Sequence, residues 1–60
     1  MNIIQQGTQQ NIIKILEARF PISEEIKEKI YAQQDLEMLD TWFQYAVNAT
    51  SLKEFMAKIF

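Results

Sequence analysis

The chain has 60 residues, of which 48 % are hydrophobic, and its six basic and eight acidic residues give a net charge of −2. This length permits one domain at most, and the acidic balance disfavours nucleic-acid binding, which normally needs a basic face. The lack of Cys and His removes disulfides, the usual zinc ligands and the commonest general base. Without such a staple, so small a core supplies only about 3 to 5 kcal/mol, and oligomerisation is the remaining common source of stability.

Residues 1–10 are rich in Gln and contain the single Gly of the chain, Gly7. One interpretation is a linker, with Thr8 capping a helix that begins at Gln9. The other is a helix extension that starts near Asn2 and passes through Gly7 at a cost of about 1 kcal/mol. We prefer the extension, because Ile4 is in phase with Ile15. The expected organisation is therefore a linker or helix extension over residues 1–10 and one helical domain over residues 11–60.

The first two helices of the domain are predicted from their apolar stripes and from the residues at their ends. Apolar residues at helical spacing predict a helix to about Arg19, which Pro21 ends because Pro lacks the N–H that a helix interior needs. Ser23 is a good N-cap for a second helix over residues 24–32. The two apolar stripes consist of Ile12, Ile13, Leu16 and Phe20 in the first helix, and of Ile22, Ile26 and Ile30 in the second.

The central helix is predicted over residues 36–48, with Asp35 as its N-cap. Its apolar residues cover an arc of about 200°, nearly twice the width that a surface helix needs to meet one core. We divide this arc into two stripes, one for the core of the domain and one for contact with a partner. The predicted core stripe is Leu36, Leu39, Phe43 and Val47, and the predicted contact stripe is Met38, Trp42, Tyr45 and Ala49.

The last helix is predicted over residues 52–59, because residues 51–54 read as a capping box that begins at Ser51 and ends at Glu54. No alternation of apolar and polar residues and no hairpin turn predicts a strand. We therefore expect an all-α fold, a compact bundle of four short helices that is homodimeric.

The sequence offers little that would support catalysis. Glu24 and Glu25 lie where acids stabilise a helix N-terminus. Glu25 and Lys27 also spell the E-x-K of metal-dependent nucleases, but that signature needs strand geometry and an upstream Asp. We expect no enzymatic activity, no metal and no cofactor. The apolar runs are too short for a membrane span or a signal peptide, so we expect a cytoplasmic protein that does not bind membranes.

Met38, Trp42 and Tyr45 allow two interpretations. They are either ordinary core residues or part of an interface, and the interface is favoured because Met, Trp and Tyr are enriched at interface cores. Residues on the second face of the first helix would join the same surface. The predicted interface consists of Ile4, Ile15, Ala18, Met38, Trp42, Tyr45 and Ala49.

Three segments resemble a known module: I-K-I-L-E-A-R-F at residues 13–20 followed by Pro21, D-L-E at residues 35–37 with Leu39 and Trp42, and T-S-L-K-E-F at residues 50–55. Together they are similar to the small C-terminal helical domain of the Rpn family, recombination-promoting nucleases related to PD-(D/E)XK transposase-like proteins. The similarity spans roughly residues 9–56, and the Gln-rich start resembles the linker that precedes this domain. Many members have a Gly between the Phe and the Pro, which this chain lacks.

The resemblance implies a non-catalytic chain, with the nuclease domain lying upstream of Met1. In that family the C-terminal piece can be made from an internal start codon, and it then binds the full-length nuclease and blocks it as an antitoxin does. The expected partners are a second copy of this chain and a full-length nuclease with the same domain. Two alternatives stay open: an accessory domain that binds DNA, and a purely structural oligomerisation domain.

Overall fold

The computed structural model describes the backbone of residues 3–60 and the side chains of residues 6–60. In this part of the chain the elements are α1 (Ile3–Arg19), α2 (Glu24–Ala32), α3 (Leu36–Asn48) and α4 (Leu52–Ile59), with no strand. The predicted all-α class and the four predicted helices are confirmed.

The first helix includes most of the Gln-rich segment. It begins at Ile3 and continues through Gly7, where an added Cβ would meet no neighbouring atom within 4 Å. The helix extension is thus the correct interpretation of this segment, and Thr8 lies inside α1 rather than at its start. At the other end, the Phe20 N–H still donates to the Leu16 carbonyl at 2.6 Å, and Pro21 prevents a further turn.

The N-termini of α2 and α3 are capped by the predicted side chains. The hydroxyl of Ser23 accepts a hydrogen bond from the Ile26 N–H at 3.4 Å. The carboxylate of Asp35 accepts from the N–H groups of Glu37 at 3.0 Å and Met38 at 3.4 Å. Each cap satisfies N–H groups that have no partner within their own helix, an effect worth about 1 kcal/mol.

The N-terminus of α4 forms one of the two hydrogen bonds of the predicted capping box. The hydroxyl of Ser51 accepts from the Glu54 N–H at 3.1 Å. The carboxylate of Glu54 accepts from the Thr50 hydroxyl at 2.8 Å, whereas a capping box assigns it to the backbone N–H of Ser51. Glu54 therefore ties α4 to the preceding loop through a side chain.

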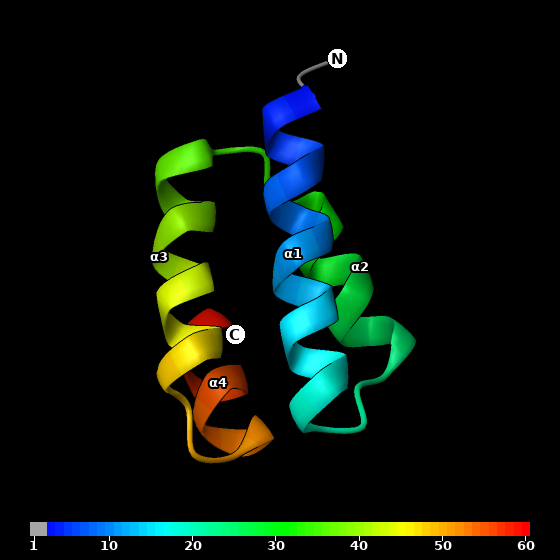
Figure 1. Cartoon of the computed structure of the whole chain (residues 1–60), viewed down its shortest axis with the longest axis vertical. Helices are drawn as coiled ribbons and strands as arrows, with labels where there is room; N and C mark the ends of the chain where they lie inside the picture. The colour runs from blue at the N-terminus through cyan, green and yellow to red at the C-terminus, as the bar shows by residue number, and fades with distance from the viewer. Residues whose placement is uncertain (1–2) are drawn as a thin grey trace.

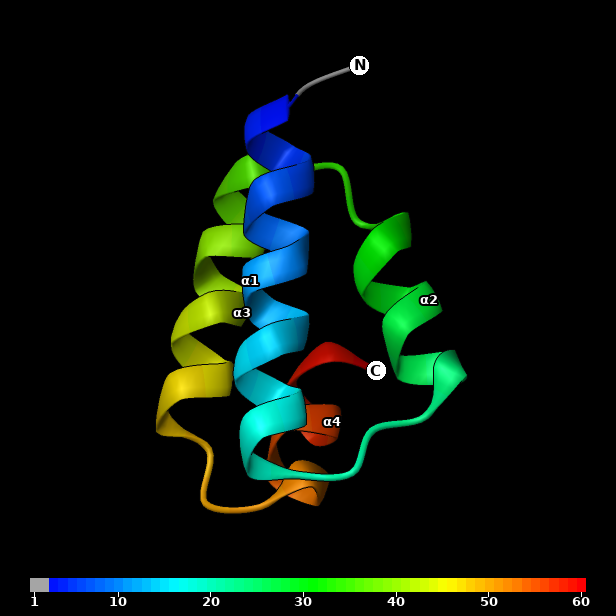
Figure 2. The ribbon, with the colours of Figure 1, turned by 45° about the vertical axis from the view of Figure 1, so that its right-hand side comes forward.

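The four helices form two layers. Figures 1 and 2 show α1 and α3 side by side in the front layer, running in the same direction, with α2 and α4 behind them. The turn of the chain at Pro21 sends α2 back along α1, and the loop after α2 crosses over to the start of α3 (Figure 2). Helix α4 packs behind the C-terminal half of α3 (Figure 1).

The core lies between these layers and receives side chains from every helix. Its largest fully buried members each stabilise the fold by about 1.5 to 3 kcal/mol. The predicted stripes of α1 and α2 both contribute buried residues, and α4 contributes Phe55 and Ile59. The core comprises Ile12, Ile13, Leu16, Ile26, Ile30, Leu39, Trp42, Ala46, Ala49, Phe55 and Ile59.

Candidate protein-interaction surface

The C-terminal end of α3 is held by a side chain from α1. Arg19 donates from Nη1 to the Ala46 carbonyl at 2.7 Å and to the Val47 carbonyl at 3.1 Å, and from Nη2 to the Ala49 carbonyl at 2.5 Å. These carbonyls lie where a helix leaves its acceptors unpaired, and a cation there also interacts favourably with the helix dipole. Arg19 therefore fixes the end of α3 against the end of α1.

A second α1 side chain holds the loop between α2 and α3. Gln9 is 5 % exposed, and its Nε2 donates to the Tyr31 carbonyl at 3.2 Å and to the Gln33 carbonyl at 2.6 Å. A buried amide of this kind needs both partners, because an unpaired polar group costs about 1 to 3 kcal/mol. Gln9 therefore positions the start of α3 beside the first half of α1.

Together, Gln9 and Arg19 fix the register of α1 and α3. Ten positions apart on α1, they bind carbonyls just before α3 and at its last turn. Because the two helices run in the same direction (Figure 1), residues midway between the two anchors are level with the middle of α3. Lys14 on α1 and Asp40 on α3 are such residues.

The residues of α3 that enter the core lie along the middle of its apolar arc. Leu39 and Ala46 are fully buried, Trp42 is 5 % exposed and Ala49 is 3 % exposed. This corrects the division of α3 into stripes, because Trp42 and Ala49 belong to the core and Val47, predicted to be buried, is 46 % exposed. The arc is centred on the core, so both of its edges are only partly covered.

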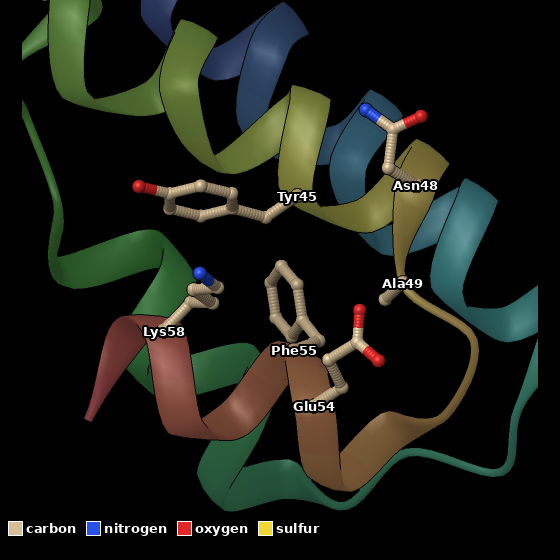
Figure 3. Close-up of a pocket in the computed structure, with 6 residues that line it drawn as sticks. All are labelled: Tyr45, Asn48, Ala49, Glu54, Phe55 and Lys58. Carbon is tan, nitrogen blue, oxygen red and sulfur yellow. The ribbon is translucent and has the colours of Figure 1, made fainter.

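One edge of the arc faces α4. Tyr45 lines a pocket of roughly 230 Å³ with Asn48 and Ala49 of the α3 end and with Glu54, Phe55 and Lys58 of α4. Figure 3 shows the rings of Tyr45 and Phe55 and the Lys58 chain extending toward one another across this junction, and the Lys58 ammonium lies 5.5 Å from the Tyr45 ring centroid. Met38, two turns earlier on the same edge, is 43 % exposed. Helix α4 thus covers Tyr45 and leaves Met38 uncovered.

The other edge of the arc continues onto α1. Val47 lies about 160° around the helix from Tyr45, and half-buried Phe43 is beside it on the same edge. On α1, whose Arg19 binds the Val47 carbonyl, half-buried Ile15 lies one turn before Arg19 and exposed Ala18 lies directly before it. We name this surface, formed by Ile15, Ala18, Phe43 and Val47, the α1–α3 face. Helical phase places Ala18 and Val47 on the sides of α1 and α3 that are turned away from the core.

The seven predicted interface residues therefore do not share one surface. Ile15 and Ala18 lie on the α1–α3 face, Met38 and Tyr45 lie on the opposite edge of α3, and Trp42 and Ala49 lie in the core. Ile4 falls within α1, but its side chain lies outside the described residues. Phe43 and Val47, both predicted for the core, differ: Phe43 is half-buried and packs against the core, whereas Val47 is exposed.

Charged groups surround the α1–α3 face rather than fill it. Lys14 and Asp40 are both exposed, and neither forms an ion pair in the part of the chain that the structure describes. The ion pairs found among the described residues involve Lys27 of α2: its Nζ lies 3.3 Å from a carboxylate oxygen of Glu17 in α1, which joins the two helices, and 3.6 Å from one of Glu24 within α2. The hydrogen bond to Glu17 and the charges of both glutamates raise the pKa of Lys27.

Two other kinds of site are absent from the part of the chain that the structure describes. Among residues 6–60, whose side chains are described, no three or more carboxylates are grouped to hold a metal ion. None of the helices described has both the length and the apolar character that crossing a membrane requires.

Comparisons with known proteins do not assign the chain to a family. No family model matches it, and no curated protein or solved structure matches it either.

Proposed function

We propose that this chain is a non-catalytic, self-associating helical module that binds a full-length nuclease carrying the same domain and inhibits it. The resemblance to the C-terminal domain of the Rpn family supplies the nuclease as partner. The observation that carries the self-association is the α1–α3 face, on which Val47 remains 46 % exposed beside Phe43, Ile15 and Ala18. Apolar side chains gathered across two helices are typical of protein-binding surfaces.

The α1–α3 face is preferred over the Met38 edge for a structural reason. The α1–α3 face extends over two helices, whereas the edge of α3 that carries Met38 is occupied by α4 at Tyr45. The face is also held in place at both ends, because Arg19 and Gln9 fix α3 beside α1. A rigid surface loses less conformational entropy on binding than a mobile one.

Inhibition follows from self-complementarity. A patch that pairs with a second copy of itself also pairs with the same patch in a longer protein. If the nuclease assembles through this domain, the short chain competes for that contact and replaces an active partner with one that lacks a nuclease domain. Inhibition of the nuclease should then increase with the concentration of the short chain.

The test is a nuclease assay with a purified Rpn-family enzyme that contains this domain. We expect the wild-type chain to co-purify with the enzyme and to suppress DNA cleavage. Val47→Glu should lose both effects while circular dichroism shows unchanged helix content. Gln44→Glu, which adds the same charge to the outer side of α3, is the matched control and should still inhibit. Undiminished cleavage at a large excess of folded wild-type chain would contradict the proposal.

A further inference from the structure

The size of the molecule limits how much surface two copies can bury through the α1–α3 face. The molecule measures 31 × 20 × 19 Å along its principal axes, and the view of Figure 1 looks down the shortest of them onto α1 and α3. The outline of the whole molecule in that view is at most about 600 Å², so a contact through this face buries less than about 1,200 Å² over the two copies. Such an area is typical of weak or transient association rather than of permanent dimers.

Helical phase places at each edge of the face one charged side chain that has no ion pair among the described residues. Asp40 is about 20° from Val47 around α3, and Lys14 is about 40° from Ala18 around α1. The register set by Gln9 and Arg19 brings Lys14 and Asp40 to a similar height along the two helices. One edge of the face is thus acidic and the other is basic at nearly the same level.

This arrangement distinguishes two ways of pairing the faces. If the two-fold axis runs along the helices, α1 of one copy lies against α3 of the other, and each Lys14 meets the Asp40 of the opposite copy. If the axis runs across the helices, α3 lies against α3 in the reverse direction, and the two Asp40 carboxylates approach one another. Opposed like charges disfavour the second arrangement, and complementary charges favour the first.

We infer that the α1–α3 face binds a second copy of this chain in parallel, about a two-fold axis along the helices, with Lys14 of each copy paired with Asp40 of the other. This inference rests on the proposed function and adds to it the orientation of the two domains. The same orientation would apply to the complex with the nuclease, since its domain would present the equivalent face.

Asp40→Asn gives opposite results for the two arrangements. In the parallel pairing it removes two attractions and should weaken the dimer about threefold in Kd at low salt. In the antiparallel pairing it relieves a repulsion and should tighten the dimer. Glu37→Gln, which removes an exposed acid one turn earlier on the outer side of α3, is the matched control and should leave Kd unchanged. Sedimentation equilibrium measures all three dissociation constants.

Charge reversal adds a test that uses two different chains. Lys14→Glu alone and Asp40→Lys alone each place like charges opposite one another, so each should dimerise about tenfold more weakly than the wild-type chain. An equimolar mixture of the two variants restores both pairs, and it should form a mixed dimer of wild-type affinity. High salt should reduce these differences.

The outcomes separate the orientation from the proposed function. A mixed dimer, together with weakening by Asp40→Asn, supports the parallel pairing. Tightening by Asp40→Asn, or variants that all keep the wild-type Kd, would overturn the parallel pairing while leaving self-association intact. A wild-type chain that stays monomeric at every concentration would overturn both, and a dimer that fails to inhibit the nuclease would overturn the proposed function alone.

Discussion

The two edges of α3 differ in what covers them. Along the edge that faces α4, Tyr45 lines a pocket together with Phe55 and Lys58, and the Lys58 ammonium lies over its ring (Figure 3). Along the other edge, Val47 is exposed, and Phe43 is half-buried and packs against the core, with α1 as the neighbouring helix. The apolar arc of α3 is thus wider than the part that the core buries, so apolar side chains remain outside the core at both edges. The path of the chain decides which of these edges another helix covers. The uncovered edge that meets a second helix is the better candidate for binding.

The largest expected effect concerns the buried residues of α3 that lie between its two edges. Trp42→Ala should destabilise the domain by about 3 to 5 kcal/mol, because it opens a cavity where a nearly fully buried indole now packs. For a chain of this size such a loss amounts to unfolding at room temperature. Thermal denaturation followed by circular dichroism measures it. A folded Trp42→Ala variant with a near wild-type Tm would contradict the placement of Trp42 in the core.

The next effect concerns the side chain that sets the start of α3. Gln9→Ala removes both hydrogen bonds to the Tyr31 and Gln33 carbonyls and should cost about 1 to 3 kcal/mol. Gln10→Ala, an exposed neighbour on α1, is the control and should change stability by less than about 0.5 kcal/mol. Urea denaturation compares the two variants. Equal midpoints for both would show that Gln9 does not hold this loop.

Arg19→Gln should have a smaller effect, because the guanidinium is exposed to solvent even though it reaches three carbonyls of the α3 end. We expect a loss of about 1 kcal/mol. The variant should also weaken dimerisation, because the last turn of α3 carries Val47 and loses its anchor to α1. Destabilisation without any change in dimer affinity would separate this anchor from the binding surface.

The smallest expected effect is the pH dependence of the pair between α1 and α2. The pKa of Lys27 is raised in the folded chain by Glu17 and Glu24, so the folded state binds this proton more tightly than the unfolded state. Its stabilisation is complete below the ordinary lysine pKa and is lost as the pH rises through the raised value. NMR titration of the Lys27 side chain should give a pKa above the ordinary lysine value. Glu17→Gln should lower the value for Lys27, and an unchanged pKa would contradict the assigned cause.

The sequence predicted the helices because their ends carry local signals. Ser23, Asp35, Ser51 and Pro21 each act on a backbone group within a few residues, and the structure places the helix ends at those positions. The start of α1 was less certain, because Gly7 weakens a helix without stopping it and only the phase of Ile4 favoured continuation.

The sequence did not predict which part of α3 meets the core. Periodicity gives the width of an apolar arc but not the direction of the core, which depends on where α1 and α4 pack. For this reason Trp42, which is predicted for the contact stripe, lies in the core, and Val47, which is predicted for the core, is exposed. The roles of Gln9 and Arg19 also depend on contacts between residues 22 to 30 positions apart, and no local signal distinguishes these two side chains from other polar residues of α1.

Methyl NMR during dilution compares the two edges of α3 most directly. Spectra of the wild-type chain are recorded from high to low concentration, with the methyl groups of Ile15, Val47 and Met38 assigned. Binding through the α1–α3 face predicts that the Ile15 and Val47 signals move together with concentration while the Met38 signal stays in place. Movement of Met38 alone, or three signals that do not change over the whole range, would contradict it.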